Sequence, residues 1–218
     1  VTLDLWDENL VERLRGAESH FVPNGYSIRM CTVDTSKEQS SYSVILRSGQ
    51  ADGVLLTGLA TPETYPVLTD ICSEAYAACV PVIGMSNAFP VELVENVAEI
   101  DDEHGAYLAV NHLIEHGHKR IAFIGVENQI WSKHREDGYK KALLNAGIQN
   151  DPNLIVNGQR NQNWAYSATL KLINESNFTA VFVVMDNLAI AVMSALRDEG
   201  KNIPQDCAVI GFDNNEQV

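Results

Sequence analysis

The stretch that decides the fold reads DDEHGAYLAVNHLIEHGHKRIAFIG, residues 101–125, and it predicts a helix, a sharp stop and a buried strand in succession. Asp101 and Asp102 stand where a helix start favours an oxygen cap and negative charge. Apolar residues then recur at three- and four-residue spacing, which predicts a helix over 103–116. Gly117 follows, where a left-handed helix end is least costly for glycine. The apolar run 121–125 is typical of a strand that is buried on both faces.

The remainder of the chain repeats this alternation of helices and short apolar strands. We expect further helices at 10–21, 38–46, 64–78, 135–145, 165–174 and 188–199, and further strands at 26–33, 53–56, 81–85, 154–156, 181–184 and 208–212. Such alternation implies parallel strands joined by crossover helices. The rhythm pauses between Leu93 and Asp101. The sequence therefore predicts an α/β protein of two doubly wound parallel-sheet lobes, 1–99 and 100–218, with a ligand cleft between them.

Composition and charge narrow the class of protein. The chain has 218 residues, 45% of them apolar, which is enough for a substantial core. No apolar run reaches the roughly 18 to 20 residues that cross a bilayer, and no basic signal-peptide region precedes Leu3. The formal net charge is −14, with 29 acidic residues against 15 lysines and arginines. Such a field repels phosphate backbones, so we expect this stretch to bind neither DNA nor an anionic membrane by itself.

The cysteines indicate a reducing compartment. None of the four, Cys31, Cys72, Cys79 and Cys207, belongs to a Cys-x-x-Cys pair. Cys72 and Cys79 lie seven residues apart on one predicted helix, about 10 Å along its axis, which is too far for a disulfide. Reduced thiols fit a cytoplasmic location.

Enzyme and metal motifs are missing from the sequence. There is no Gly-x-Ser-x-Gly elbow, no phosphate-binding Gly-x-x-x-x-Gly-Lys and no His-Glu-x-x-His, so we predict a protein that is not an enzyme and needs no cofactor. His112 and His116 are one helical turn apart, a spacing that allows a shared metal. They also flank a predicted helix end, where histidines interact well with the last carbonyls, and we favour that second reading over a metal site.

Several short sequence segments occur in the same order as in one known family. They are ADGVLL at 51–56, VPVI at 80–83, GHKRI at 117–121, REDGY at 135–139 and VIGFD at 209–213. Together they resemble the effector-binding domain of the lactose-repressor/galactose-repressor (LacI/GalR) family of bacterial transcription regulators. The resemblance spans essentially the whole chain and implies the periplasmic-binding-protein-like fold, type I. The family's helix-turn-helix head and hinge helix have no counterpart here, and we expect the second lobe to be incomplete at its C-terminal end.

The resemblance also implies a function. A small polar effector, a sugar or sugar phosphate, would bind between the lobes of a cytoplasmic homodimer, and closure would change the affinity for operator DNA of heads that this chain lacks. One alternative is a secreted sugar-binding protein of a transporter. Another is a regulator that senses a phosphoprotein partner.

Two residues lead the predicted site. The family's arginine in the Arg-x-x-Gly-Tyr segment is Arg135 here. The resemblance implies that its guanidinium donates paired hydrogen bonds to ligand hydroxyls or a carboxylate. The alternative is an exposed cation at a helix start, where its charge opposes the helix dipole; that awkward placement favours the ligand role. Asp213 ends an apolar strand and would accept hydrogen bonds from ligand hydroxyls, or cap the following segment.

The other candidates have weaker support. The resemblance makes Trp164 an aromatic platform for the ligand, the alternative being core packing. Asp101 would be the family's interlobe aspartate, or a simple helix cap. Met185 stands where the family usually has an asparagine, so the ligand would be less polar there or differently oriented. Residues expected along the wall of the first lobe are Trp6, Asp7, Asn9, Ser86 and Asn87.

The family dimerises largely through its first lobe. The predicted helix 64–78 is rich in small and apolar residues, namely Val67, Leu68, Ile71, Ala75, Ala77 and Ala78. We expect some of these side chains to be buried between subunits.

Overall fold

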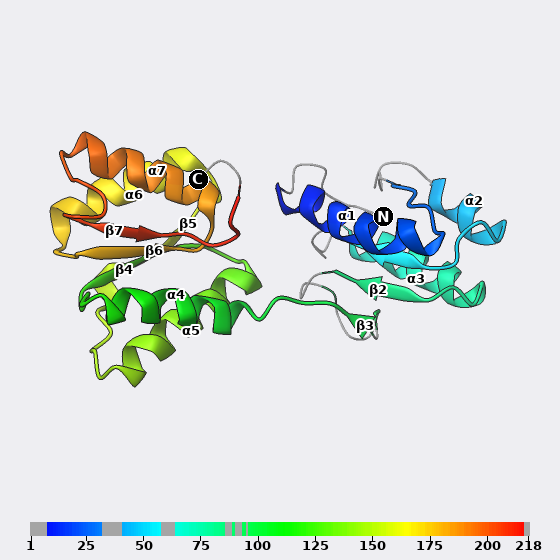
Figure 1. The fold of residues 1–218 in the computed structure, drawn as a ribbon, viewed down its shortest axis with the longest axis horizontal. Helices are drawn as coiled ribbons and strands as arrows, with labels where there is room; N and C mark the ends of the chain where they lie inside the picture. The colour runs from blue at the N-terminus through cyan, green and yellow to red at the C-terminus, as the bar shows by residue number, and fades with distance from the viewer. Residues whose placement is uncertain are drawn as a thin grey trace. The chain divides into compact units, whose positions relative to one another are not determined.

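A computed structural model describes residues 8–31, 41–57, 64–85, 89, 93–94 and 96–215 (Figure 1). The chain divides into two compact units, Val1–Ile100 and Asp101–Val218. Each unit has an apolar core of its own, so each is described separately.

In its described residues, unit 1 contains a short parallel sheet and three α-helices. Its elements are α1 (Glu8–Phe21), the 3-10 turn η1 (Val22–Asn24), α2 (Ser41–Arg47), β1 (Val54–Leu56), α3 (Tyr65–Ala77), β2 (Val82–Gly84) and β3 (Asn96–Val97). The sheet order is β1-β2-β3, with Val54 opposite Val82 and Ile83 opposite Asn96. The largest fully buried side chains of this core are Leu56, Leu68, Ile71 and Val94.

The predicted strand 26–33 is wrong for the part that the structure describes. Residues 26–31 belong to no strand, and 32 and 33 lie outside the described residues. A strand needs a neighbouring strand to accept and donate its backbone hydrogen bonds. Here the segment and β1 line a shared cavity of about 470 Å³, together with α1 and α2. Alternating side chains alone therefore did not specify a strand.

Unit 2 is a three-layer α/β structure. Its elements are α4 (Asp102–Glu115), β4 (Ile121–Val126), α5 (Ile130–Asn145), the 3-10 turn η2 (Pro152–Leu154), β5 (Ile155–Gly158), α6 (Gln162–Glu175), β6 (Ala180–Val183), α7 (Asp186–Asp198) and β7 (Ala208–Ile210). The strands are all parallel, in the order β5-β4-β6-β7. Helices α4 and α5 cover one face of the sheet and α6 and α7 cover the other (Figure 1).

Local chemistry explains where these elements begin and end. Every residue of β4 is buried, as a central strand covered by helices on both faces requires. Asp101 caps α4 by accepting a hydrogen bond from the backbone N–H of His104 at 2.9 Å. Gly117 follows α4 with a φ of +91°, a conformation in which a Cβ would be strained. Because the four strands of this sheet are parallel, their carboxyl ends lie at one edge of unit 2.

Two helices of unit 2 begin earlier than the sequence predicted. Helix α5 begins at Ile130 and not at Arg135, and α6 begins at Gln162 and not at Ala165. Apolar residues at helical spacing mark only the turns that face the core. Helix α5 begins with the adjacent apolar residues Ile130 and Trp131 and continues with the polar residues 132–137, so its start shows no such spacing. The remaining helices and strands of unit 2 lie within two residues of their predicted bounds.

The cysteines are free thiols, as expected. Cys31 and Cys207 are buried, and burial raises the pKa of the Cys207 thiol to about 12. Among the helices that the structure describes, none is both long and apolar enough to cross a membrane.

Candidate functional site

A buried arginine organises the carboxyl-end edge of the unit 2 sheet. Arg135 is 6% exposed, and its Nε and one terminal nitrogen lie 2.8 and 2.7 Å from Oδ1 of Asp102, the first residue of α4. Its other terminal nitrogen donates to the carbonyl of Val184, just after β6. One side chain thus ties α5 to α4 and to the end of a central strand. A buried charge is tolerated only with such pairing.

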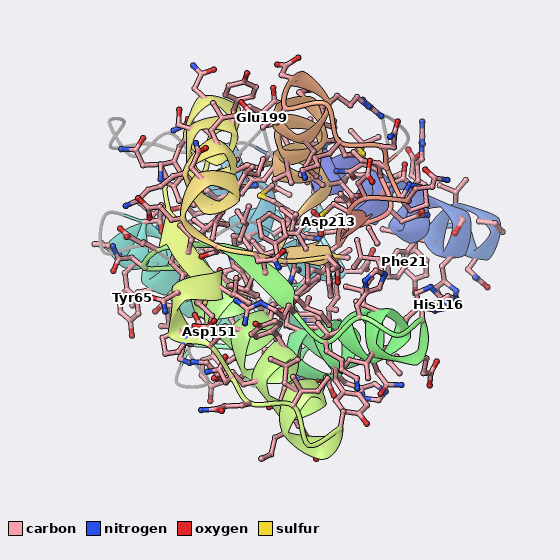
Figure 2. The ribbon with its side chains drawn as sticks, turned by 90° about the vertical axis from the view of Figure 1, so that its left-hand side faces the viewer. Phe21, Tyr65, His116, Asp151, Glu199 and Asp213 are labelled. Atoms are coloured by element: carbon pink, nitrogen blue, oxygen red, sulfur yellow. The ribbon has the colours of Figure 1, made fainter. Side chains whose placement is uncertain are left out.

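Aromatic rings and a second carboxylate surround the same guanidinium. The ring centroid of Phe212 lies 3.6 Å from the guanidinium carbon of Arg135, and that of Trp131 lies 5.0 Å away. Asp213 brings a carboxylate oxygen to 3.6 Å of the arginine. Asp213 lies between the α6–α7 layer and the α4–α5 layer (Figure 2). The structure therefore brings together two residues that the sequence singled out, Arg135 and Asp213.

The geometry changes the argument for Arg135. It is the sixth residue of α5, so its charge does not stand at the helix start, and the helix-dipole argument for a ligand role was wrong. Asp102 compensates the charge instead. A direct contact between Arg135 and an effector stays a prediction.

The start of α7 adds a second polar group to this edge. The carboxylate of Asp186 is buried and accepts a hydrogen bond from the backbone N–H of Asn215 at 2.8 Å. The side chain of Gln162, at the start of α6, donates to Asn187. Met185 precedes α7 and belongs to the apolar core at 5% exposure.

Asp101 and Trp164 both have structural partners. Asp101 is the N-cap of α4, and Trp164 packs on Gly158, where an added Cβ would lie 2.2 Å from the indole ring. Trp164 is only partly buried and contacts the core of unit 2. Their predicted ligand contacts remain predictions.

Sequence reasoning missed four residues of this edge: Asp102, Trp131, Arg160 and Phe212. The guanidinium carbon of Arg160 lies 6.0 Å from the ring centroid of Trp131, so both arginines approach one indole. Arg160 is exposed, and no carboxylate in the described part of the chain forms an ion pair with it. The signal for Asp102 was its place directly before the predicted helix 103–116, and for Phe212 its place at the end of the predicted strand 208–212. Trp131 and Arg160 lie within the loops between a predicted strand and the next predicted helix, where no pattern singled them out.

Several predicted wall residues fall outside what the structure describes. Trp6, Asp7, Ser86 and Asn87 lie outside the described residues. Asn9 lies in α1, but its side chain is outside them as well.

The histidine pair has the local role that the sequence favoured. Nδ1 of His116 lies 2.8 Å from the backbone carbonyl of His112, at the C-terminal end of α4. His116 is seen at that end of the helix in Figure 2. Within the described ranges, no group of three or more His, Cys, Asp or Glu side chains is placed to hold a metal ion.

Known proteins similar to this chain agree with the fold. Residues 110–218 match the family of periplasmic binding protein-like domains. The chain is 31% identical over 193 residues to the HTH-type transcriptional regulator DegA of Bacillus subtilis, a match that covers 87% of the chain and 56% of the relative. It is 33% identical over 215 residues to the HTH-type transcriptional repressor CytR of Escherichia coli K12, covering 97% of the chain and 61% of the relative.

A solved structure extends the comparison. A LacI family transcriptional regulator from Enterococcus faecium, with bound ribose, superimposes with a TM-score of 0.76 at 25% identity, covering 99% of this chain and 78% of that one. The predicted α/β fold is confirmed, and the relatives are transcriptional regulators and not enzymes, as the sequence predicted. The chain spans 56% to 61% of the length of these two curated relatives.

Proposed function

This chain belongs to the periplasmic binding protein-like domain family, in the form carried by LacI-family transcriptional regulators, and on that premise we propose that it senses a small polar effector for such a regulator. The observation that carries the proposal is the group of aromatic and charged side chains at the carboxyl-end edge of unit 2. In open α/β sheets, ligands bind at this edge. Trp131 and Phe212 offer flat apolar faces, and Asp213 is a nearby hydrogen-bond acceptor.

The chemistry of this edge suits a ligand with a flat or ring-shaped body and several hydroxyl groups. Indole and phenyl faces cover the apolar face of a sugar or base, while carboxylate and amide groups bind hydroxyls. Bound ribose in the Enterococcus faecium regulator supports a sugar-like effector. Enclosure of the ligand between the two units belongs to the proposal.

The proposed mechanism is a shift in conformation. The effector would favour one arrangement of the two units, and in a cytoplasmic homodimer this would change the affinity of attached DNA-binding heads for operator DNA. The size of that change is limited by the difference in effector affinity between the two arrangements. The chain itself carries a net charge of −14 and would not contribute phosphate contacts.

Exposed apolar side chains on unit 1 support the homodimer. Tyr76, near the end of α3, is 86% exposed, and Val44 of α2 is 70% exposed. By contrast Leu68, Ile71 and Ala75 of α3 are buried in the core of unit 1, so the subunit contact would use the opposite side of the helix.

The test is calorimetric titration with pentoses, hexoses, disaccharides and nucleosides. We expect at least one to bind, and Trp131→Ala to weaken it about 3- to 10-fold through loss of the stacking face. Ile130→Ala is the matched control, because Ile130 is the neighbouring residue on α5 and is 51% exposed. Absence of binding by every compound, with a phosphoprotein partner required instead, would contradict the proposal.

A further inference from the structure

We propose that the effector carries an oxyanion group, a phosphate or a carboxylate, and that Arg160 binds it. This inference rests on the proposed function and narrows the class of ligand. Its basis is the pairing of charges along the carboxyl-end edge of unit 2.

The charged side chains that surround Arg135, and the carboxylate at the start of α7, all have partners. Asp102 pairs with Arg135, Asp213 lies 3.6 Å from the same arginine, and Asp186 accepts the backbone N–H of Asn215. Among the described residues, none forms a hydrogen bond or ion pair with the side chain of Arg160, whose guanidinium carbon lies 6.0 Å from the ring centroid of Trp131. The edge therefore presents one guanidinium whose donors remain available to a ligand.

The contact with Trp131 places this guanidinium next to the proposed ligand surface. Arg135 and Arg160 both approach the ring of Trp131. Because the effector would stack on this ring, the available donors of Arg160 lie beside the body of the bound effector. Arg160 directly precedes Asn161, the N-cap of α6. The positive end of that helix dipole favours negative charge at the same place.

A guanidinium discriminates between ligands. Its planar donors match the geometry of a phosphate or carboxylate and form bidentate, charge-assisted hydrogen bonds with it. A neutral sugar offers only hydroxyl oxygens, which lack both the negative charge and the paired acceptor geometry of these anions. Arg160 thus favours an anionic effector over its neutral parent compound.

The first experiment uses inorganic phosphate and acetate as probes, titrated into the protein and followed by NMR. The variants are Arg160→Gln and, as a matched control, Arg197→Gln, which removes an exposed arginine in the last turn of α7. We expect saturable, millimolar-range binding that Arg160→Gln weakens at least about 5-fold and Arg197→Gln leaves unchanged. Equal affinity in all three proteins, or no saturable binding of either anion, overturns the inference.

The second experiment separates this inference from the proposed function. It compares ribose with ribose 5-phosphate and adenosine with adenosine monophosphate. We expect the phosphorylated member of a pair to bind at least about 10-fold more tightly, and Arg160→Gln to abolish that preference. If the neutral and phosphorylated members of each pair bind the parent equally tightly, or if the preference for the phosphorylated member survives in Arg160→Gln, the proposed function stands and this inference fails. If the simple anions bind at Arg160 but no sugar or nucleoside of either kind binds, the anion site stands and the proposed function loses its support.

Discussion

A charged side chain can lie in an apolar interior only where its charge is compensated, and Arg135 meets that condition through Asp102. The two residues are 33 positions apart in sequence, and α4 and α5 bring them together. Breaking such a buried pair leaves an uncompensated charge, which is far more costly than losing an exposed ion pair.

Arg135→Ala should therefore lower the free energy of unfolding by about 3 to 5 kcal/mol, because the buried carboxylate of Asp102 would lose the guanidinium that compensates its charge. Urea unfolding followed by circular dichroism measures this change. Arg197→Ala, an exposed arginine on α7, should stay within about 0.5 kcal/mol of the parent. A parent-like stability for Arg135→Ala would mean that the pair does not hold α4 and α5 together.

A double replacement distinguishes the contribution of the Arg135–Asp102 charge pair from that of the packing around it. Arg135→Met combined with Asp102→Leu removes both charges, so it should be more stable than Arg135→Met alone. The comparison needs only the same unfolding experiment on three variants. A double variant less stable than the single one would indicate that packing around the guanidinium, and not the charge, dominates.

The close contact between Gly158 and Trp164 gives another prediction at this scale. A Cβ at position 158 would lie 2.2 Å from the indole, and both residues are held by β5 and α6. Gly158→Ala should cost about 1 to 3 kcal/mol of stability through overpacking. Adding Trp164→Leu should recover part of that loss, since a smaller side chain leaves room for the methyl group. Thermal unfolding of both variants tests this, and a neutral Gly158→Ala would contradict the packing role of Trp164.

At the scale of elements, the sequence predicted what periodicity and caps determine locally. Helix α4 and strand β4 follow directly from the spacing of their apolar residues and from Asp101 and Gly117. The start of α5 could not be predicted in this way, because the apolar residues of its first turn do not recur at three- or four-residue spacing. The strand expected at 26–33 failed for a different reason, since a strand depends on a neighbour that the segment's own sequence does not reveal. The pair of Asp102 with Arg135 likewise depends on helix packing, and local patterns do not report it.

Hydrogen bonds and charges around Glu136 of α5 make the free energy of unfolding depend on pH. Burial acts to raise the pKa of Glu136, but hydrogen bonds from Lys140 and Asn157 and the charges of Lys140 and Lys133 outweigh it and hold that pKa below its usual 4.5. A carboxyl with a lowered pKa in the folded state stabilises the fold above the unfolded value. This contribution is lost as the pH falls through the folded value.

Glu136→Gln should therefore flatten the stability profile on the acidic side. Between about pH 5 and pH 3, unfolding free energy should fall more steeply for the parent than for the variant. Glu175→Gln is the control, because Glu175 is exposed and its nearest lysine nitrogen is 3.9 Å away. Parallel profiles for the parent and Glu136→Gln would show that the network does not favour the charged carboxyl.

At the scale of the whole molecule, alternation of strands and helices predicted two parallel-sheet units, and a pause in that alternation predicted where one gives way to the other. The structure divides the chain after Ile100. Unit 2 is contiguous in sequence and encloses its own apolar core, with Phe123, Phe182 and Tyr139 fully buried. The hydroxyl of Tyr139 donates to the carbonyl of Ile121, so this core contains its own polar partner as well.

These features predict that residues 101–218 fold without unit 1. A domain of this size, with one continuous core and all its strands paired within itself, has enough buried apolar surface to be stable alone. The fragment should unfold in a single cooperative transition and retain a helical circular dichroism spectrum. Phe182→Asp in the same fragment is the control, since an unpaired carboxylate in the middle of β6 should abolish the transition. A parent fragment that unfolds without cooperativity would mean that the core of unit 2 needs contributions from the first 100 residues.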